Sequence, residues 1–204
     1  MAVGRKPVSS GLGLENTKIK VDDKGFIEVD MQRRTTEKNI YAIGDVAGEP
    51  MLAHKASHEG RVAVEAIAGR ATAFEPRAIP AVVFTDPEIA WCGLTATEAK
   101  QSKQKVEIVK FPWAASGRLA TLDRESGLTK FVIDPETEQI LGVGIVGPGA
   151  GELISEGALA IEMAAVVSDV RLTIHPHPTL SETVMETADL FFGESTHYYR
   201  PKRK

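Results

Sequence analysis

The amino-acid sequence predicts an α+β fold in which helices cover an antiparallel sheet, preceded by a partial α/β segment. Between residues 80 and 147, short apolar runs are paired across turn residues as in hairpins. Helical segments follow these hairpins instead of alternating with single strands, which favours an antiparallel sheet. A linker with two prolines, "RATAFEPRAIP", precedes the hairpins. We therefore predict a domain boundary at about residue 75, between segments 1–74 and 75–204.

Composition and charge exclude several classes of protein. The chain has 204 residues, of which 43% are hydrophobic and 25% charged, as in ordinary globular proteins. The net charge of -4 argues against broad nucleic-acid binding. The single cysteine, Cys92, excludes an intrachain disulfide, and the apolar run "ALAIEMAAVV" is about half a membrane span and contains Glu162. We expect a soluble protein in a reducing compartment.

The first segment predicts two strands and a helix. "VDDKGFIEVD" indicates a turn at residues 23–25 and then a short strand, Phe26–Val29. "NIYAIGD" predicts a buried strand that ends in a turn. A helix is expected from Leu52 to Ala68, with Gly69 just past its end. Helical periodicity places six residues on its packed face: Ala53, Ala56, Gly60, Ala63, Val64 and Ile67.

The second segment predicts hairpins and then helices. "AVVFT" and "EIAWCGL" are strands separated by the turn signal Asp86-Pro87, and "KVEIVKFPW" alternates as a strand. "GLTKFVID" and "QILGVGIVG" form a hairpin around "PETE". "TATEAKQSK" is a short helix in which Thr95 and Glu98 fit a capping box. "GAGELISEGALAIEMAA" is a helix entered through glycines, and a last helix runs roughly from Leu180 to Phe192.

The stretch "YAIGDVAGEPMLAH" is the first candidate site. Asp45 follows the predicted strand, at the end where open α/β sheets bind ligands, and its carboxylate suits sugar or ribityl hydroxyls. The backbone of Met51–Ala53 begins a helix, whose free N–H groups would stabilise an anionic ligand such as a reduced flavin. The alternative is a plain turn followed by an ordinary helix start, and the spacing by itself leaves both open.

The stretch "HPHPTLSE", residues 175–182, is the second candidate site. His177 suits proton transfer near neutral pH, and Glu182 would fix its tautomer, with a proline on each side of His177 restricting the backbone. Alternatively, Thr179 and Glu182 form a capping box, a role compatible with catalysis because a carboxylate has two oxygens. A metal site on His175 and His177 lacks further ligands.

Cys92, among apolar neighbours, is expected to be a buried structural thiol.

These motifs resemble one family. "RTTEKNIYAIGDVAGEPMLAHKASHEG" resembles the second FAD-binding stretch of the pyridine nucleotide-disulfide oxidoreductases. Within that family, "HPHPTLSE" resembles the active-site stretch of the dihydrolipoamide dehydrogenases, which oxidise dihydrolipoamide with NAD through FAD and a redox disulfide. "IPAVVFTDPEIAWCGLTATEA" and "FPWAASGRL" resemble the C-terminal interface domain, and "VGRKP" the last strand of the NAD-binding domain. The resemblance covers nearly the whole chain in one order.

The resemblance implies roles for particular residues. Asp45, after Gly44, would contact the ribityl-phosphate part of FAD, and His177 and Glu182 would be the acid/base pair that serves the other subunit of a homodimer formed through residues 75–204. The His177–Pro178 bond would be cis. The implied cofactors are FAD and NAD, and the implied partner is the lipoyl domain of a 2-oxoacid dehydrogenase complex. Four consecutive residues would approach the flavin ring: Met51, Leu52, Ala53 and His54.

Three family features are missing from the sequence. It contains no Cys-x4-Cys pair and no glycine-rich FAD fingerprint near its start. The glycine-rich stretch "GVGIVGPGAG" follows a hairpin strand, so we interpret it as a helix entry and not as the G-x-G-x-x-G loop that binds NAD. We therefore expect a C-terminal portion of the enzyme, with the end of the NAD domain and the central domain in 1–74. Alone, it would be inactive and without stoichiometric FAD, in the bacterial cytoplasm or the mitochondrial matrix. The alternative is a non-catalytic dimerisation or binding module of the same fold.

Overall fold

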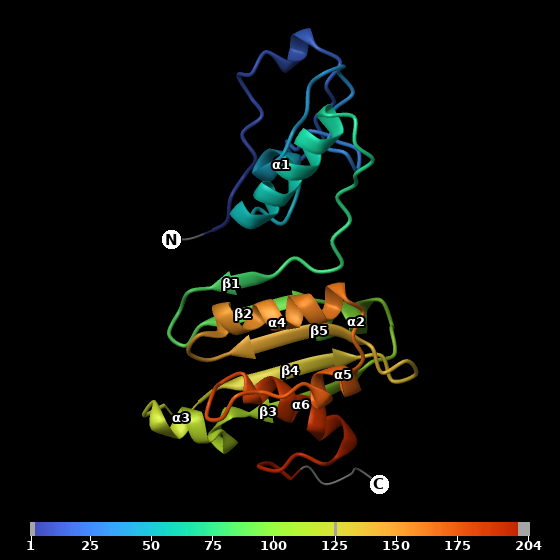
Figure 1. Ribbon diagram of the computed structural model, residues 1–204. Helices are drawn as coiled ribbons and strands as arrows, with labels where there is room; N and C mark the ends of the chain where they lie inside the picture. The colour runs from blue at the N-terminus through green and yellow to red at the C-terminus, as the bar shows by residue number, and fades with distance from the viewer. Residues whose placement is uncertain (1–2, 125, 200–204) are drawn as a thin grey trace. The chain divides into compact units, whose positions relative to one another are not determined.

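The computed structural model describes residues 3–124 and 126–199 and divides the chain into two compact units (Figure 1). The first unit is Met1–Pro76 and the second is Arg77–Lys204. None of the helices in the described residues is long and apolar enough to cross a membrane.

A five-stranded antiparallel sheet forms the centre of the second unit. In spatial order the strands are β1 (Ala81–Val83), β2 (Ile89–Gly93), β5 (Ile140–Val146), β4 (Leu128–Ile133) and β3 (Glu107–Pro112). Every neighbouring pair is antiparallel. The predicted α+β class and the predicted strands of this segment are confirmed.

Helices pack on the sheet and leave a single core between the layers. Helix α4 (Ala150–Glu162) contacts β2 and β5, and α6 (Glu182–Phe192) contacts β3 and β4, so both lie in front of the sheet in Figure 1. The short helix α5 (Val167–Leu172) packs against α6. The largest fully buried side chains of this core include Trp113, Phe111, Phe131, Leu119, Ile133, Ile140, Ile145 and Ile154.

The remaining helices of the second unit are short. Helix α2 (Ala96–Gln101) begins at Thr95, and the predicted capping box is present: Glu98 N–H donates to Thr95 Oγ1 at 3.2 Å and Thr95 N–H donates to Glu98 Oε2 at 2.8 Å. The 3-10 helix η3 (Trp113–Ala115) leads into α3 (Gly117–Thr121). The sequence did not predict α3 or α5, because five or six residues are too few to establish a helical period and neither helix begins with a Ser/Thr-x-x-Glu pattern such as the one that indicates α2.

Trp113 joins the sheet to the start of α6. Its ring is fully buried, and its Nε1–H donates to Thr129 Oγ1 on β4 at 2.8 Å. Thr129 Oγ1 in turn lies 2.8 Å from Thr183 Oγ1 in the first turn of α6. Buried hydroxyl and indole groups are costly unless they are paired, and here each has a partner. This chain of hydrogen bonds fixes the helix that carries Glu182.

Replacing Gly127 by alanine is expected to destabilise the second unit by about 1–3 kcal/mol, as overpacking of a tight core does. A Cβ at this position would lie 2.4 Å from Cε3 of the buried Trp113 ring, which has no space to move. Urea unfolding followed by tryptophan fluorescence measures the change. Gly117→Ala is the matched control, because nothing lies within 4 Å of its Cβ. Equal stabilities of the two variants would contradict the packing described here.

The first unit contains one long helix and little regular structure besides. Helix α1 runs from Ala53 to Ile67, and Gly69 follows it with φ 77°, as predicted. The 3-10 helices η1 (Leu14–Asn16) and η2 (Gly44–Ala47) precede it. The buried residues of α1 are Lys55, Glu59, Val62, Ala63 and Ala66.

The predicted packed face of α1 is wrong. Only Ala63 of the six predicted residues is among its buried residues, while Val64 and Ile67 are 65% and 63% exposed. The buried face is rotated toward Lys55 and Glu59 because these two side chains find ionic and hydrogen-bonding partners inside the unit. A periodicity count treats charged residues as solvent-facing, so it cannot detect a face built around a buried ion pair.

The two predicted strands of the first unit are also wrong. The turn at residues 23–25 forms, since Gly25 N–H donates to Asp22 O at 3.0 Å, but Ile27 makes only an isolated bridge with Val21. In "NIYAIGD", Tyr41 makes one bridge with Arg34, and Ile40 is 40% exposed. A strand needs a continuous partner for its N–H and C=O groups, and the described residues supply none.

Candidate active site and cofactor-contacting segment

His177 and Glu182 form a hydrogen-bonded pair at the start of α6. His177 Nδ1 lies 2.8 Å from Glu182 Oε1. The other carboxylate oxygen, Oε2, accepts from Thr179 N–H at 2.8 Å. One oxygen of the carboxylate therefore holds the imidazole, and the other holds the backbone of Thr179 just before α6. The predicted capping box is wrong, because α6 begins at Glu182 with Ser181 as its N-cap, no side-chain cap hydrogen bond forms there, and Thr179 Oγ1 donates to Pro176 O at 2.7 Å instead.

The backbone around His177 is restrained on both sides. Prolines flank it, and the His177–Pro178 peptide bond is cis. The His177 side chain is 73% exposed, while that of Glu182 is 17% exposed. With Nδ1 held by the carboxylate, the Nε2 atom of His177 is the one left for a substrate. This arrangement suits general acid/base chemistry at an accessible surface.

The environment of Glu182 lowers the pKa of its carboxyl from the ordinary 4.5. Desolvation acts in the opposite direction and is the largest single effect, but the hydrogen bonds from Thr179 and His177 and the charges of His177 and His197 outweigh it together. Because the pKa is lower in the folded chain than in the unfolded one, these contacts stabilise the fold above pH 4.5. That contribution is lost as the pH falls through the lowered pKa.

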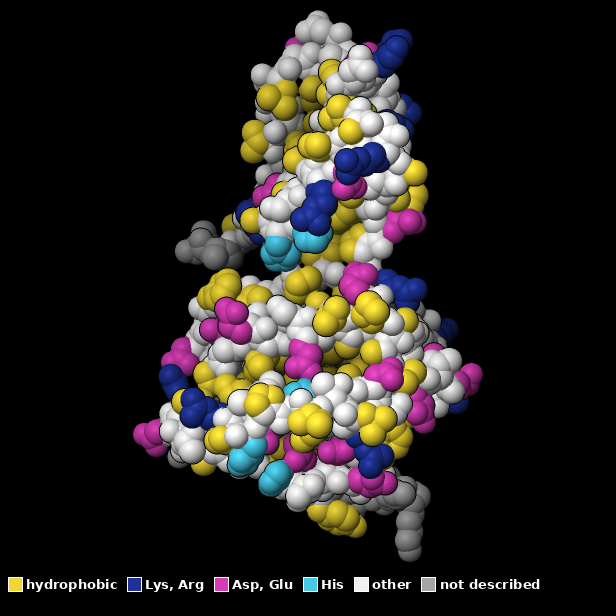
Figure 2. Space-filling view, in the orientation of Figure 1, with side chains coloured by type: hydrophobic (Ala, Val, Ile, Leu, Met, Phe, Trp, Pro, Cys, Tyr) yellow, Lys and Arg dark blue, Asp and Glu magenta, His cyan; other side chains and the backbone are white. Residues whose placement is uncertain are grey.

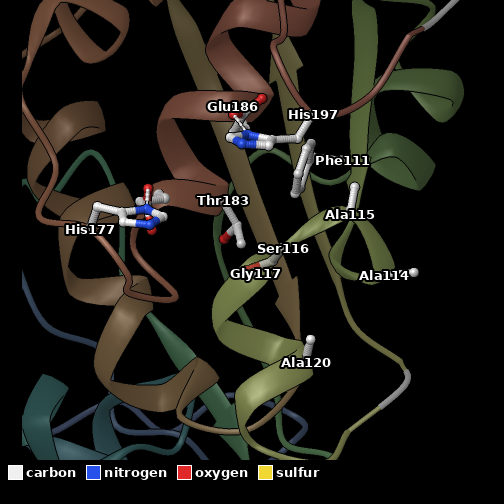
Figure 3. A pocket seen from close by; sticks show the side chains of 11 residues that line it. Phe111, Ala114, Ala115, Ser116, Gly117, Ala120, His177, Thr183, Glu186 and His197 are labelled. Atoms are coloured by element: carbon white, nitrogen blue, oxygen red, sulfur yellow. Dashed lines mark hydrogen bonds and ion pairs between the residues drawn. The ribbon is translucent and has the colours of Figure 1, made fainter.

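A cavity of about 280 Å³ adjoins the pair (Figure 3). One wall is polar and comes from His177, from α6 and from the segment after it. The opposite wall is apolar and comes from the end of β3, η3 and α3. The lining residues are Phe111, Ala114, Ala115, Ser116, Gly117, Ala120, His177, Glu182, Thr183, Glu186 and His197.

His175 and Cys92 have buried side chains, which indicates a structural role for both. The His175 side chain is 4% exposed, with Nε2 2.7 Å from Glu156 Oε1 on α4 and Nδ1 2.8 Å from Thr173 O. His175 thus ties the segment before His177 to α4. Cys92 is 1% exposed, and burial raises the pKa of its thiol to about 12. A thiol in this state is a poor nucleophile, as expected of a structural residue.

The other predicted site residues lie together in the first unit. Gly44 and Asp45 begin η2, and Met51 and Leu52 lead into the N-terminus of α1, where Ala53 and His54 stand. Among the described residues, no side chain caps the N-terminus of α1, where the positive end of the helix dipole lies at Ala53. The Asp45 side chain is 48% exposed and forms an ion pair with Arg5 at 3.7 Å.

A buried charged triad, missed by the sequence analysis, supports this segment. Glu59 is fully buried, and its Oε1 accepts from Arg33 at 2.9 Å and lies 3.0 Å from Lys55 Nζ. Its Oε2 accepts from Gly44 N–H at 2.6 Å, and Lys55 donates to Gly48 O at 2.9 Å. The triad thereby fastens η2 to α1. The spacing of Lys55 and Glu59 with Val62 and Ala66, on one helical face, was the available signal.

Family models match both units. Residues 79–188 match the pyridine nucleotide-disulphide oxidoreductase dimerisation domain, and residues 1–60 match the pyridine nucleotide-disulphide oxidoreductase model. The dimerisation model spans the sheet, α4, α5 and most of α6. The chain therefore belongs to the pyridine nucleotide-disulphide oxidoreductase family, whose members are oxidoreductases.

Within this family, the chain is similar to dihydrolipoyl dehydrogenases. It is 48% identical to that of Haemophilus influenzae over 100% of this chain and 43% of the relative. It is 52% identical to that of Thermus scotoductus over 97% of this chain and 42% of the relative. The chain thus spans less than half the length of these curated relatives.

Solved structures agree with the fold. LpdA from Mycobacterium tuberculosis aligns with a TM-score of 0.86 and 30% identity, over 94% of this chain and 42% of that one. The HOCl-induced flavoprotein disulfide reductase RclA from Escherichia coli aligns with a TM-score of 0.85 and 28% identity, over 93% of this chain and 44% of that one.

Proposed function

We propose that this chain supplies the acid/base pair and the subunit interface of a dihydrolipoyl dehydrogenase, which oxidises dihydrolipoamide with NAD. The observation that carries the proposal is the 2.8 Å contact between His177 Nδ1 and Glu182 Oε1 at the edge of a cavity. A dithiol must lose its protons before its sulfur attacks a disulfide, because the thiolate is the nucleophile. The imidazole of His177 is placed to accept such a proton.

The pair divides the work of proton transfer. His177 Nε2 takes the proton from the substrate thiol, and the imidazolium that forms donates from Nδ1 to Glu182 Oε1. The lowered pKa of the Glu182 carboxyl keeps it ionised, so it stabilises the imidazolium electrostatically. The bond from Thr179 N–H to Oε2 holds the carboxylate in place during this step.

The first unit is proposed to contact FAD, which when bound supplies two-electron transfer between the thiols and NAD. Its residues fit an anionic ring edge and a polyhydroxyl chain, because no side chain in the described part of the chain caps the N-terminus of α1 and the Asp45 side chain is 48% exposed. The ribityl part is assigned to Gly44 and Asp45. The residues assigned to the flavin ring are Met51, Leu52, Ala53 and His54.

We propose a homodimer formed through the second unit. Figure 2 shows hydrophobic side chains on its surface over α4 and α5, with acidic side chains between them. Four hydrophobic residues in α4 and α5 or within two residues of their C-terminal ends are strongly exposed, from 63% to 95%: Leu159, Met163, Leu172 and Ile174. Apolar side chains in such numbers on one face mark an interaction surface. A second subunit would cover them and bring the partner's half of the active site to His177.

The sequence contains one cysteine, so the redox disulfide of the proposed enzyme belongs to residues other than these 204. We accordingly expect the isolated chain to be inactive and to retain no stoichiometric FAD. The physiological partner would be a lipoyl domain of a 2-oxoacid dehydrogenase complex, in the bacterial cytoplasm or the mitochondrial matrix. The single cysteine equally suits a second candidate, a non-catalytic dimerisation module.

Subunit complementation tests the proposal. The isolated chain is refolded together with the full-length Haemophilus influenzae relative, in which the histidine matching His177 is replaced by glutamine. We expect dihydrolipoamide oxidation to return, because the mixed dimer has one site with a functional His–Glu pair. The same chain carrying His177→Gln is the control and should restore nothing. Mixed dimers that form, as seen by native mass spectrometry, but stay inactive would support the non-catalytic module instead.

A further inference from the structure

Helix α6 carries a second histidine–carboxylate pair that the proposed function does not use. Glu186 lies one turn after Glu182, is 3% exposed, and has its Oε1 2.5 Å from His197 Nδ1. Both pairs line the same cavity of about 280 Å³ (Figure 3). Two carboxylates four residues apart on one helix thus present two imidazoles to one space.

The two pairs share their geometry. In each, the carboxylate takes Nδ1 of the imidazole, at 2.8 Å for His177 and 2.5 Å for His197. A neutral imidazole that donates from Nδ1 has its lone pair on Nε2. Among the residues that the structure describes, neither Nε2 atom has a hydrogen-bond partner. Each pair therefore offers one base, and the His197 side chain is 53% exposed, which leaves it accessible.

His197 is held in position by the segment around it. Ser195 Oγ donates to Glu186 Oε2 at 2.5 Å, so the buried carboxylate has a partner on each oxygen. Tyr198 N–H donates to Ser195 Oγ at 3.3 Å, and the Tyr198 ring stands edge-on to Phe111 with 6.4 Å between centroids. These contacts fasten residues 195–198 to α6 and to β3, which gives the imidazole a fixed place.

The opposite wall indicates the chemistry of the ligand. It consists of small or apolar side chains, among them Ala114, Ala115 and Ala120, and none of its lining residues is titratable. A ligand that satisfies both walls has a short hydrocarbon body and two groups that give up protons. A dithiol has this composition, with an acidic proton on each sulfur.

We propose that His197, held by Glu186, is a second general base that deprotonates the second thiol of the substrate. This inference rests on the function proposed above and extends it from one proton acceptor to two. His177 would serve the first thiol and His197 the second. Each imidazole would then handle a single proton in each turnover.

The first thiol gives its proton to His177 Nε2, and its thiolate attacks one sulfur of the enzyme's cysteine disulfide, so that the S–S bond breaks, a mixed disulfide forms and one cysteine thiolate leaves. The second thiol gives its proton to His197 Nε2, and its thiolate attacks the substrate sulfur of the mixed disulfide. The substrate closes as a disulfide and the second cysteine thiolate leaves. Two electrons pass to the enzyme disulfide and two protons to the imidazoles.

Among the described residues that line the cavity, the charged groups around His197 lie on one side of it. Glu186 and Glu182 face it from α6, and His177 faces it from the segment before α6. The β3–α3 wall contributes no titratable group among its lining residues. The pH dependence of a dithiol reaction here should therefore report on these two histidines.

The test compares His197→Asn with His197→Ala in a flavin-loaded, full-length enzyme that contains residues 1–204. Asparagine places an amide N–H near the position of Nδ1, so it keeps the bond to Glu186 but has no base at Nε2. We expect both variants to lower kcat for dithiol oxidation on the order of 10²-fold, the usual effect of losing a general base. NADH oxidation by an artificial acceptor, which involves no thiol, should be unchanged. Tyr199→Phe, in the same segment, is the matched control.

The pH profile separates catalysis from structure. With two bases, log kcat/KM on the acidic side should fall with a slope approaching about 2 per pH unit, and with about 1 in His197→Asn. Wild-type activity and slope in His197→Asn would overturn the proposal, since the residue would then serve only to hold the segment. Failure of the proposed function has a different signature, namely dithiol oxidation that survives His177→Asn.

Discussion

Replacing Glu59 by alanine is expected to lower the free energy of unfolding of the first unit by about 3–5 kcal/mol, because it leaves two buried cations without their counter-charge. The side chains of Arg33 and Lys55 are 12% and 3% exposed, and Glu59 Oε1 is the acceptor that both of them share. In the described part of the chain, Arg33 Nε has no hydrogen-bond partner, so loss of Glu59 would leave the Arg33 guanidinium with further unpaired N–H groups. Gly44 N–H would also lose its acceptor.

Hydrogen exchange of the α1 amides, residues 53–67, measures this effect within one unit. The strands of the second unit serve as an internal reference, because they belong to a separate compact unit. Glu65→Ala is the matched control in the same helix, since among the described residues Glu65 accepts a single side-chain hydrogen bond, from Thr72 Oγ1 at 3.0 Å. Exchange that is equally fast in the two variants would show that the triad does not hold the unit together.

The triad also explains how far the sequence could predict the first unit. The bounds of α1 followed from periodicity and from Gly69, which are local signals. The buried face of α1 did not follow from these local signals. Burial of Lys55 and Glu59 depends on Arg33 and on the Gly44 backbone, which lie outside the helix. The two strands failed for a related reason. An apolar, β-branched run favours an extended backbone, but it forms a strand only where another strand pairs with it.

The strands and most helices of the second unit could be predicted because the sequence signals for them come from neighbouring residues. Apolar runs alternate or cluster with period two, and turn residues stand between them, so the hairpin of β4 and β5 follows from neighbouring residues. The order of the strands in the sheet does not follow from neighbouring residues. Strand β2 pairs with β5, about fifty residues later in the chain, and the hydrophobic pattern does not say which distant strands pair.

The candidate sites show the same division. His177 and Glu182 are five residues apart, so a turn followed by a helix brings them together, and the sequence indicates the pair directly. The sequence favoured neither capping nor proton transfer for Glu182, whereas in the structure its two oxygens hold His177 and the Thr179 N–H that precedes α6, and the capping box does not form. Glu186 and His197 are eleven residues apart across the end of a helix, and no motif links them. Only the fold brings this second pair to the cavity.

Replacing His177 by glutamine is expected to lower kcat/KM for dihydrolipoamide about 10²- to 10⁴-fold in a full-length enzyme that contains residues 1–204. Glutamine is similar in size and polarity, and the side chain it replaces is 73% exposed, so packing should not suffer. The loss would come from the missing base at Nε2. Steady-state assay of dithiol oxidation, beside thiol-independent NADH oxidation on the same samples, separates this step from cofactor binding.

Glu182→Gln provides the comparison that assigns the role of the carboxylate. A glutamine has one acceptor oxygen, whereas Glu182 accepts from His177 and from Thr179 with different atoms. One of these hydrogen bonds must break, and the imidazolium loses the charge that stabilises it. We therefore expect a smaller loss of kcat/KM than in His177→Gln, because the base itself remains. The double variant should be no worse than His177→Gln, since a carboxylate that acts through an imidazole has no task once the imidazole is gone. Additive losses would mean that Glu182 acts on the substrate independently of His177.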